Sequence, residues 1–82
     1  MPLYMDVHNL LRAVTPEAIT AAKQRDAAVQ DKYGVKYLRY WYDASTGHMF
    51  CLVEAPDRES AFKVHREAHG AIANEIYEVI EG

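Results

Sequence analysis

The residues of this sequence best suited to chemistry are its four histidines, and two pairs of residues have a spacing that suits a metal ion. His65 and His69 are four residues apart, so on one helix they would lie on adjoining turns of the same face, as two imidazole ligands require. Asp6 and His8 are two residues apart, so on a strand they would point to the same side and offer a carboxylate and an imidazole to one ion.

Each pair also has an ordinary structural explanation. His65 lies among apolar residues at helical spacing and can equally be a hydrogen-bonded core residue, whereas His69 can be a solvated cation at a helix end. Asp6 and His8 can form the polar rim of a sheet. Spacing alone therefore leaves a metal site and a structural role both open.

Several other kinds of site are disfavoured. The stretch His65 to His69 lacks the Glu that directly follows the first His of a zinc protease helix. Cys51 lies in the middle of an apolar run, which predicts a buried small hydrophobe rather than a ligand. Ser45 and Ser60 lack a recognisable base, and the four glycines are too scattered for a phosphate loop. Proton transfer between a His and an acid stays open as catalysis.

Periodicity and capping signals predict six elements. Residues 3–8 and 75–81 alternate as strands do, and residues 35–43 and 48–55 form a hairpin around the turn at 44–47. A first helix begins after Thr15 with Pro16 and ends at Gly34. A second helix follows Pro56 and Asp57, with apolar positions recurring up to about Gly70.

This β-α-β-β-α-β order predicts a single α+β domain over residues 1–82 with a ferredoxin-like fold, in which two helices cover one face of a four-stranded antiparallel sheet. That topology brings together the ends of the first strand and the second helix and the starts of the third and fourth strands. We therefore expect a metal site formed mainly by His8, His65 and His69. Further candidates near these element ends are Asp6, Glu75 and His48.

Aromatic residues predict a homodimer. Half of the residues are apolar and nine are Phe, Trp or Tyr, which is rich for a domain of 82 residues. The strand at 35–43 carries large side chains on both sides, with Val35, Tyr37 and Trp41 on one side and Leu38, Tyr40 and Tyr42 on the other. A second copy of the chain is expected to cover the helix-free face of the sheet.

Charge and hydropathy disfavour nucleic acid and membranes as partners. Nine basic against twelve acidic residues give a net charge of −3 with the signs interleaved, which would repel a phosphate backbone. The sequence has neither a long apolar run nor a signal-like start, so a cytoplasmic location is expected. A single cysteine cannot form an internal disulfide.

Four segments together resemble a known family: MPLYMDVH, YGVKYLRYWYD, CLVEAPDRESAFKVHREAHG and EIYEVIEG. The chain resembles, over nearly its whole length, the small nickel-binding, nickel-responsive ferredoxin-like proteins of bacteria. The resemblance implies a homodimer with facing sheets and a divalent metal bound by imidazole and oxygen ligands. His65 corresponds to a helix-two His that the wider family often keeps, and His8 and His69 are further histidines that agree with metal binding.

Taken together, these features favour a cytoplasmic nickel-binding protein without catalytic activity, serving nickel sequestration or homeostasis. Nickel itself comes from the resemblance, because imidazoles suit copper, zinc and iron equally well. The alternative is a cofactor-free monooxygenase or another dimer that binds a small ligand in an apolar cavity between sheet and helices. A third possibility is an interaction module with no small ligand.

Overall fold

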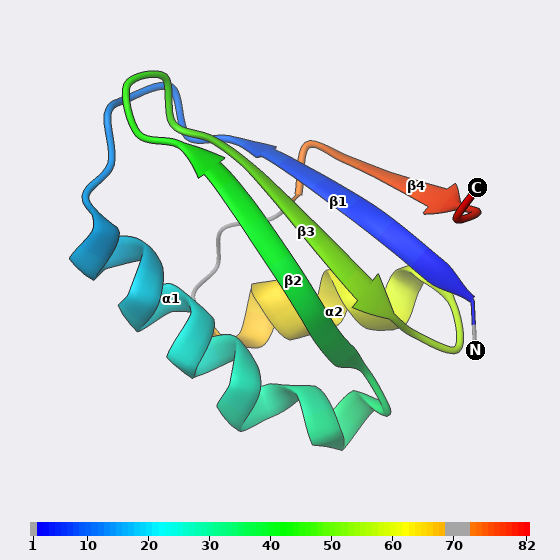
Figure 1. The fold of residues 1–82 in the computed structure, drawn as a ribbon. Coiled ribbons are helices and arrows are strands. Elements are labelled where there is room, and N and C mark those ends of the chain that lie inside the picture. The colour runs from blue at the N-terminus through cyan, green and yellow to red at the C-terminus, as the bar shows by residue number, and fades with distance from the viewer. Residues whose placement is uncertain (1, 69–72) are drawn as a thin grey trace.

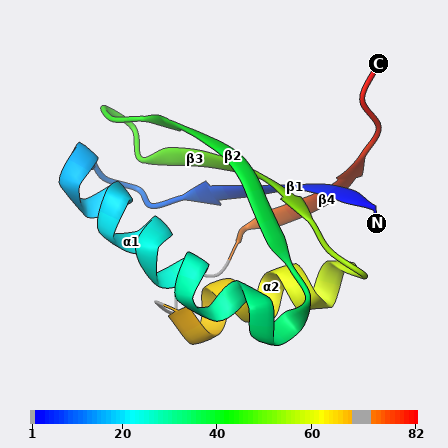
Figure 2. The same ribbon diagram turned by 60° about the horizontal axis from the view of Figure 1, so that its bottom comes forward.

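The chain folds into one sheet covered by two helices in the computed structural model, which describes residues 2–68 and 73–82. The elements are β1 (Leu3–Asn9), α1 (Pro16–Val29), the short 3₁₀ helix η1 (Gln30–Tyr33), β2 (Lys36–Asp43), β3 (His48–Glu54), α2 (Arg58–Ala68) and β4 (Glu75–Val79). All strand pairs are antiparallel, in the order β2-β3-β1-β4. Both helices lie on one face (Figures 1 and 2), so the predicted ferredoxin-like α+β fold is confirmed.

Local capping fixes where the helices begin. The Thr15 hydroxyl accepts a hydrogen bond from Ala18 N at 3.2 Å, and Pro16 occupies the first turn of α1. Asp57 caps α2, because its Oδ1 accepts hydrogen bonds from the backbone N and the hydroxyl of Ser60. Gly34 follows η1 with a φ of 67°, the left-handed conformation that glycine adopts most easily.

The strand register brings three element ends together, as the topology predicted. Asn9 at the end of β1 pairs with His48 at the start of β3. Val7 pairs with Glu75 at the start of β4. None of the helices within residues 2–68 and 73–82 is long and apolar enough to cross a membrane.

A bulge in β2 changes which side chains share a face. The pairing with β3 shifts between Tyr37 and Arg39, so Leu38 is passed over. As a result, Tyr37, Tyr40 and Tyr42 all lie opposite the helix-facing residues of β3, and Trp41 lies opposite Phe50 on the helix-free face. Simple alternation, which grouped Tyr37 with Trp41, was therefore wrong for this strand.

The core lies between the sheet and the helices and contains polar residues. Its apolar residues are Tyr4, Ile19, Val35, Met49, Cys51, Val53, Ala55, Ala61 and Val64. Four ionisable side chains are buried beside them, each at most 2% exposed, namely Asp6, His8, Asp26 and His65. Because burying unpaired charges is costly, these four side chains need charged or hydrogen-bonding partners inside the core.

Candidate metal centre

Strand alternation and helix periodicity place the buried polar groups. Tyr4, Asp6 and His8 occupy alternate positions of β1, and the burial pattern of the strand turns all three toward the helices. His65 follows the buried Val64 on the core side of α2. The predicted common side of Asp6 and His8 is therefore present, but it faces the core and not a sheet rim.

Four side chains converge on one point in the core. One potential ligand atom from each of Asp6, His8, Cys51 and His65 lies within 4.8 Å of the others. The imidazole rings of His8 and His65 meet edge to face, with their centroids 4.6 Å apart. The register explains the place of the thiol, since Cys51 pairs directly with Asp6 across β1 and β3. The cluster thus offers two nitrogens, one oxygen and one sulfur.

Two carboxylates hold the ring of His65. Its Nε2 lies 2.9 Å from Asp6 Oδ2, and its Nδ1 lies 3.0 Å from Asp26 Oδ1. Burial by itself lowers the pKa of His65, but its hydrogen bonds with Asp26, Asp6 and Cys51 outweigh burial and raise the pKa to about 11. Without a metal, His65 is therefore an imidazolium ion at neutral pH.

Lys23 and Tyr37 complete the surroundings of the carboxylates. Lys23 Nζ lies 3.1 Å from Asp26 Oδ2, donates to Cys51 Sγ at 3.5 Å and sits 4.1 Å from the centre of the Tyr37 ring. The Tyr37 hydroxyl lies 3.2 Å from Asp6 Oδ2, to which it donates. Burial, followed by the negative charges of Asp6 and Asp26, raises the pKa of the Tyr37 phenol well above its usual range. The phenol therefore remains a hydrogen-bond donor.

The donor set and its surroundings fit a divalent transition metal. Imidazole and thiolate ligands suit nickel, copper and zinc. An imidazole held by a carboxylate through Nδ1, as Asp26 holds His65, is the usual outer-shell arrangement of a histidine that binds metal through Nε2. Within the described part of the chain, the buried Asp6 Oδ1 has no hydrogen-bond partner, which leaves an acceptor oxygen for a cation.

The structure unites only some of the predicted site residues. Asp6, His8 and His65 meet in the cluster, whereas His48 and Glu75 lie on the helix-free face and do not reach it. The ring of His48 instead contacts Thr46 Oγ1 at 2.8 Å. His69 lies outside the described residues.

Sequence reasoning missed three members of this centre. Cys51 is buried, as predicted, but its thiol lies among the potential ligands. Asp26 and Lys23 of α1 are not among the predicted site residues. A signal for Asp26 was available, because Ile19, Ala22 and Asp26 recur at helical spacing and lie on one face of α1.

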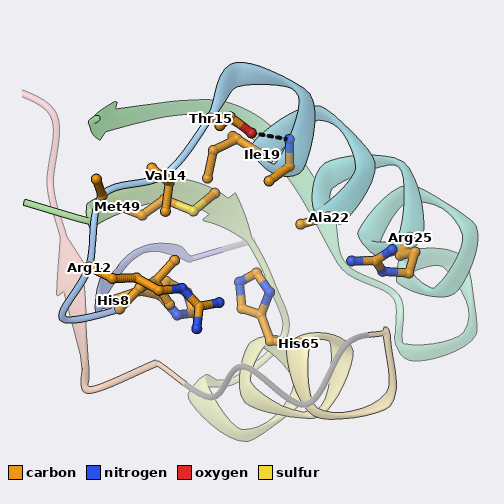
Figure 3. Close-up of a pocket in the computed structure, with 12 residues that line it drawn as sticks. His8, Arg12, Val14, Thr15, Ile19, Ala22, Arg25, Met49 and His65 are labelled. Carbon is orange, nitrogen blue, oxygen red and sulfur yellow. Dashed lines mark hydrogen bonds between the residues drawn. The ribbon is translucent and has the colours of Figure 1, made fainter. Parts of the chain in front are cut away.

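A pocket gives access to this buried centre. His8 and His65 form part of the lining of a cavity of about 360 Å³ between α1, the loop before it and β3 (Figure 3). The structure therefore contains both a buried cluster of His and acid groups and a pocket with apolar walls beside it.

Comparison with known proteins places the chain in a family. Residues 4–79 match the family model described as "Nickel responsive protein SCO4226-like". The fold is similar to the crystal structure of SCO4226 from Streptomyces coelicolor A3(2), with a TM-score of 0.91 and 35% sequence identity over 98% of each chain. No functionally curated protein matches the sequence.

Proposed function

The chain belongs to the nickel-responsive SCO4226-like family, and from this premise we propose that it binds nickel(II) through Asp6, His8, Cys51 and His65. The observation that carries the proposal is the convergence of four buried ligand atoms within 4.8 Å of one another. The role that follows is nickel sequestration or homeostasis in the cytoplasm, without catalysis.

The neighbours of the cluster support His65 as a ligand through Nε2. Asp26 accepts the Nδ1 proton at 3.0 Å, which fixes the ring and directs Nε2 toward Asp6. Lys23 in turn holds the other oxygen of Asp26. Such outer-shell contacts orient an imidazole and increase its basicity toward a metal.

The charge balance also supports exchange of a divalent ion for protons. The carboxylates of Asp6 and Asp26 are balanced by Lys23 and by the imidazolium of His65. Metal binding requires a neutral imidazole and a thiolate, so His65 and Cys51 would each give up one proton. Two positive charges would leave as two arrive, and the buried region would stay neutral.

Calorimetric nickel titration of matched variants tests this site. His8→Ala and Cys51→Ser should each weaken binding by more than the roughly 10- to 100-fold that is typical of outer-shell changes. His48→Ala and Glu75→Gln, which alter groups on the helix-free face, are the controls and should bind as the wild type does. Unchanged affinity in both His8→Ala and Cys51→Ser would refute the proposed ligand set.

His69 needs its own variant, because it follows directly after the described end of α2. His69→Ala should weaken nickel binding severely if this side chain completes the coordination, as the His65 and His69 spacing predicted. An affinity equal to that of the wild type would restrict the protein ligands to the buried cluster. The appearance of thiolate-to-nickel charge-transfer absorption, and its loss in Cys51→Ser, would identify the sulfur ligand independently.

We also propose that the protein is a homodimer whose helix-free sheet faces pack together. Apolar side chains from all four strands lie on this face, beside the polar Arg39, His48 and Glu75; the apolar ones are Leu3, Met5, Val7, Trp41, Phe50, Leu52, Tyr77 and Val79. Trp41, Phe50 and Tyr77 are 47%, 37% and 50% exposed in the single chain, and exposed apolar patches of this kind mark interaction surfaces.

Sedimentation equilibrium tests the dimer. Trp41→Asp should weaken association by about 2 kcal/mol or more, because an unpaired charge would be buried in the interface. Leu11→Asp is the matched control, since Leu11 is 83% exposed in the loop after β1 and lies off this face. A wild-type protein that is monomeric at micromolar concentration would contradict the proposal.

A further inference from the structure

The pocket beside the cluster has largely apolar walls, whereas two histidines of the cluster, His8 and His65, form its polar part. Its volume is about 360 Å³, within the range of small-molecule sites. His8 and His65 contribute nitrogen atoms, while the walls are largely apolar, with Val14, Ala18, Ile19, Ala22 and Met49. Such walls favour a ligand with an apolar body, which a bare metal ion lacks.

Two arginines give this pocket a positive charge. Arg12 comes from the loop before α1 and Arg25 from α1, and Figure 3 shows their guanidinium groups directed toward the pocket from opposite sides. Neither has a carboxylate partner within residues 2–68 and 73–82. Two positive charges that have no carboxylate partner in the described part of the chain therefore line one pocket of a protein with a net charge of −3. This arrangement attracts an anion.

The loop that carries Arg12 is held in a defined shape. Leu10 N donates to Gly47 O at 3.0 Å, and Val14 N donates to Ala44 O at 2.9 Å, so both ends of the loop are tied to the β2–β3 hairpin. Leu11 has a φ of 60°, a left-handed conformation that is unfavourable for leucine, and its side chain gains no burial there. A strained residue directly before a pocket arginine is typical of a functional loop.

We propose that this pocket binds a small organic carboxylate with an apolar body. The guanidinium groups of Arg12 and Arg25 hold the carboxylate, for which their planar donors are suited, and the apolar walls enclose the body. Occupancy of the pocket does not depend on nickel. An anion bound there would lie directly over His8 and His65 and would cover the entrance to the metal centre.

NMR titration of the metal-free protein with benzoate, benzamide and inorganic phosphate tests the proposal. Benzoate should shift the amide signals of Val14, Ile19, Ala22 and Met49 in a saturable manner. Benzamide has the same shape without the charge and should bind about tenfold more weakly or not at all. Phosphate has the charge without the apolar body and should also bind more weakly. Equal affinity for benzoate and benzamide, or for benzoate and phosphate, would overturn the proposal.

Variants assign the binding to the pocket. Arg12→Gln and Arg25→Gln should each weaken benzoate binding about tenfold, whereas Arg66→Gln, an exposed arginine of α2 outside the pocket, should leave it unchanged. Ala22→Leu should block the pocket without changing any charge. If both pocket arginine variants bind benzoate as tightly as Arg66→Gln does, the pocket is not the anion site. Because the titration contains no nickel, its failure leaves the proposed metal centre untouched.

Discussion

Nickel affinity should increase steeply with pH well beyond the range in which ordinary histidines titrate. The pKa of His65 is raised to about 11 by its carboxylate neighbours, compared with about 6.5 for an unperturbed imidazole. At pH 8 only about one molecule in a thousand would have a neutral His65 before metal arrives. Nickel must displace that proton, so the apparent affinity should rise about tenfold per pH unit, and more steeply where the thiol of Cys51 also loses its proton.

Calorimetry in buffers of different ionisation enthalpy measures the number of protons released for each nickel ion. The wild-type protein should release close to two protons at pH 7, one from His65 and one from Cys51. Cys51→Ser should release about one proton fewer. His48→Ala should retain both the proton count and the pH slope, because His48 lies on the helix-free face away from the cluster.

A different pH profile would refute this reasoning. If the affinity levels off above about pH 7 and less than one proton is released at pH 8, the ligands are ordinary exposed histidines with a pKa near 6.5. The site would then lie outside the buried cluster. Retention of the wild-type proton count in Cys51→Ser would remove only the thiol from the ligand set.

Three further predictions concern the metal-free protein. Because the pKa of His65 is raised on folding, its contribution to stability is complete below about pH 6.5 and is lost as the pH approaches 11. The free energy of unfolding in urea should therefore be about 2–3 kcal/mol lower at pH 9 than at pH 7 in the wild type but not in His65→Gln. An equal pH dependence in both proteins would contradict the raised pKa of His65. Gly47→Ala should destabilise the fold by about 2–3 kcal/mol, because φ is 82° and the new methyl group would meet the backbone of the loop after β1. Gly34→Ala, with φ at 67° but open space around it, should lower the stability by only about 1 kcal/mol. If both variants lose the same stability, the clash with the loop backbone at Gly47 does not contribute. The fully buried thiol of Cys51 should react slowly with a thiol reagent in the native protein and quickly after denaturation, and rapid native labelling would show that the core opens.

The fold followed from short-range signals. Alternation in residues 3–8 and 75–81, the Thr15 and Asp57 caps and the turn before His48 each involve residues close in sequence, so they mark the elements without knowledge of the tertiary structure. The order of these elements then restricted the topology to the ferredoxin-like sheet. The same alternation placed Asp6 and His8 on one side of their strand.

The bulge in β2 marks the limit of such reasoning. Residues 36–43 are rich in strand-forming residues, with three Tyr and a Trp, but the shift at Leu38 depends on how the strand pairs with β3. When one residue is passed over in the register, every later side chain of the strand moves to the opposite face of the sheet. Tyr37 thereby reaches Asp6 in the core, while Trp41 is directed to the opposite face.

The sequence by itself determined that three element ends meet, and with them that His8, His48 and Glu75 lie at one end of the sheet. Only the tertiary structure decided which side chains share a site. Two side chains can be neighbours at one end of the sheet and still lie on opposite faces, because successive residues of a strand point in opposite directions. His48 and Glu75 pair with the residues on either side of His8 in the sheet, Asn9 and Val7, but their side chains lie on the helix-free face. Cys51 and Asp26 come from distant segments, and the packing of α1 and α2 on the sheet brings them to His65 in a core where charges must be paired.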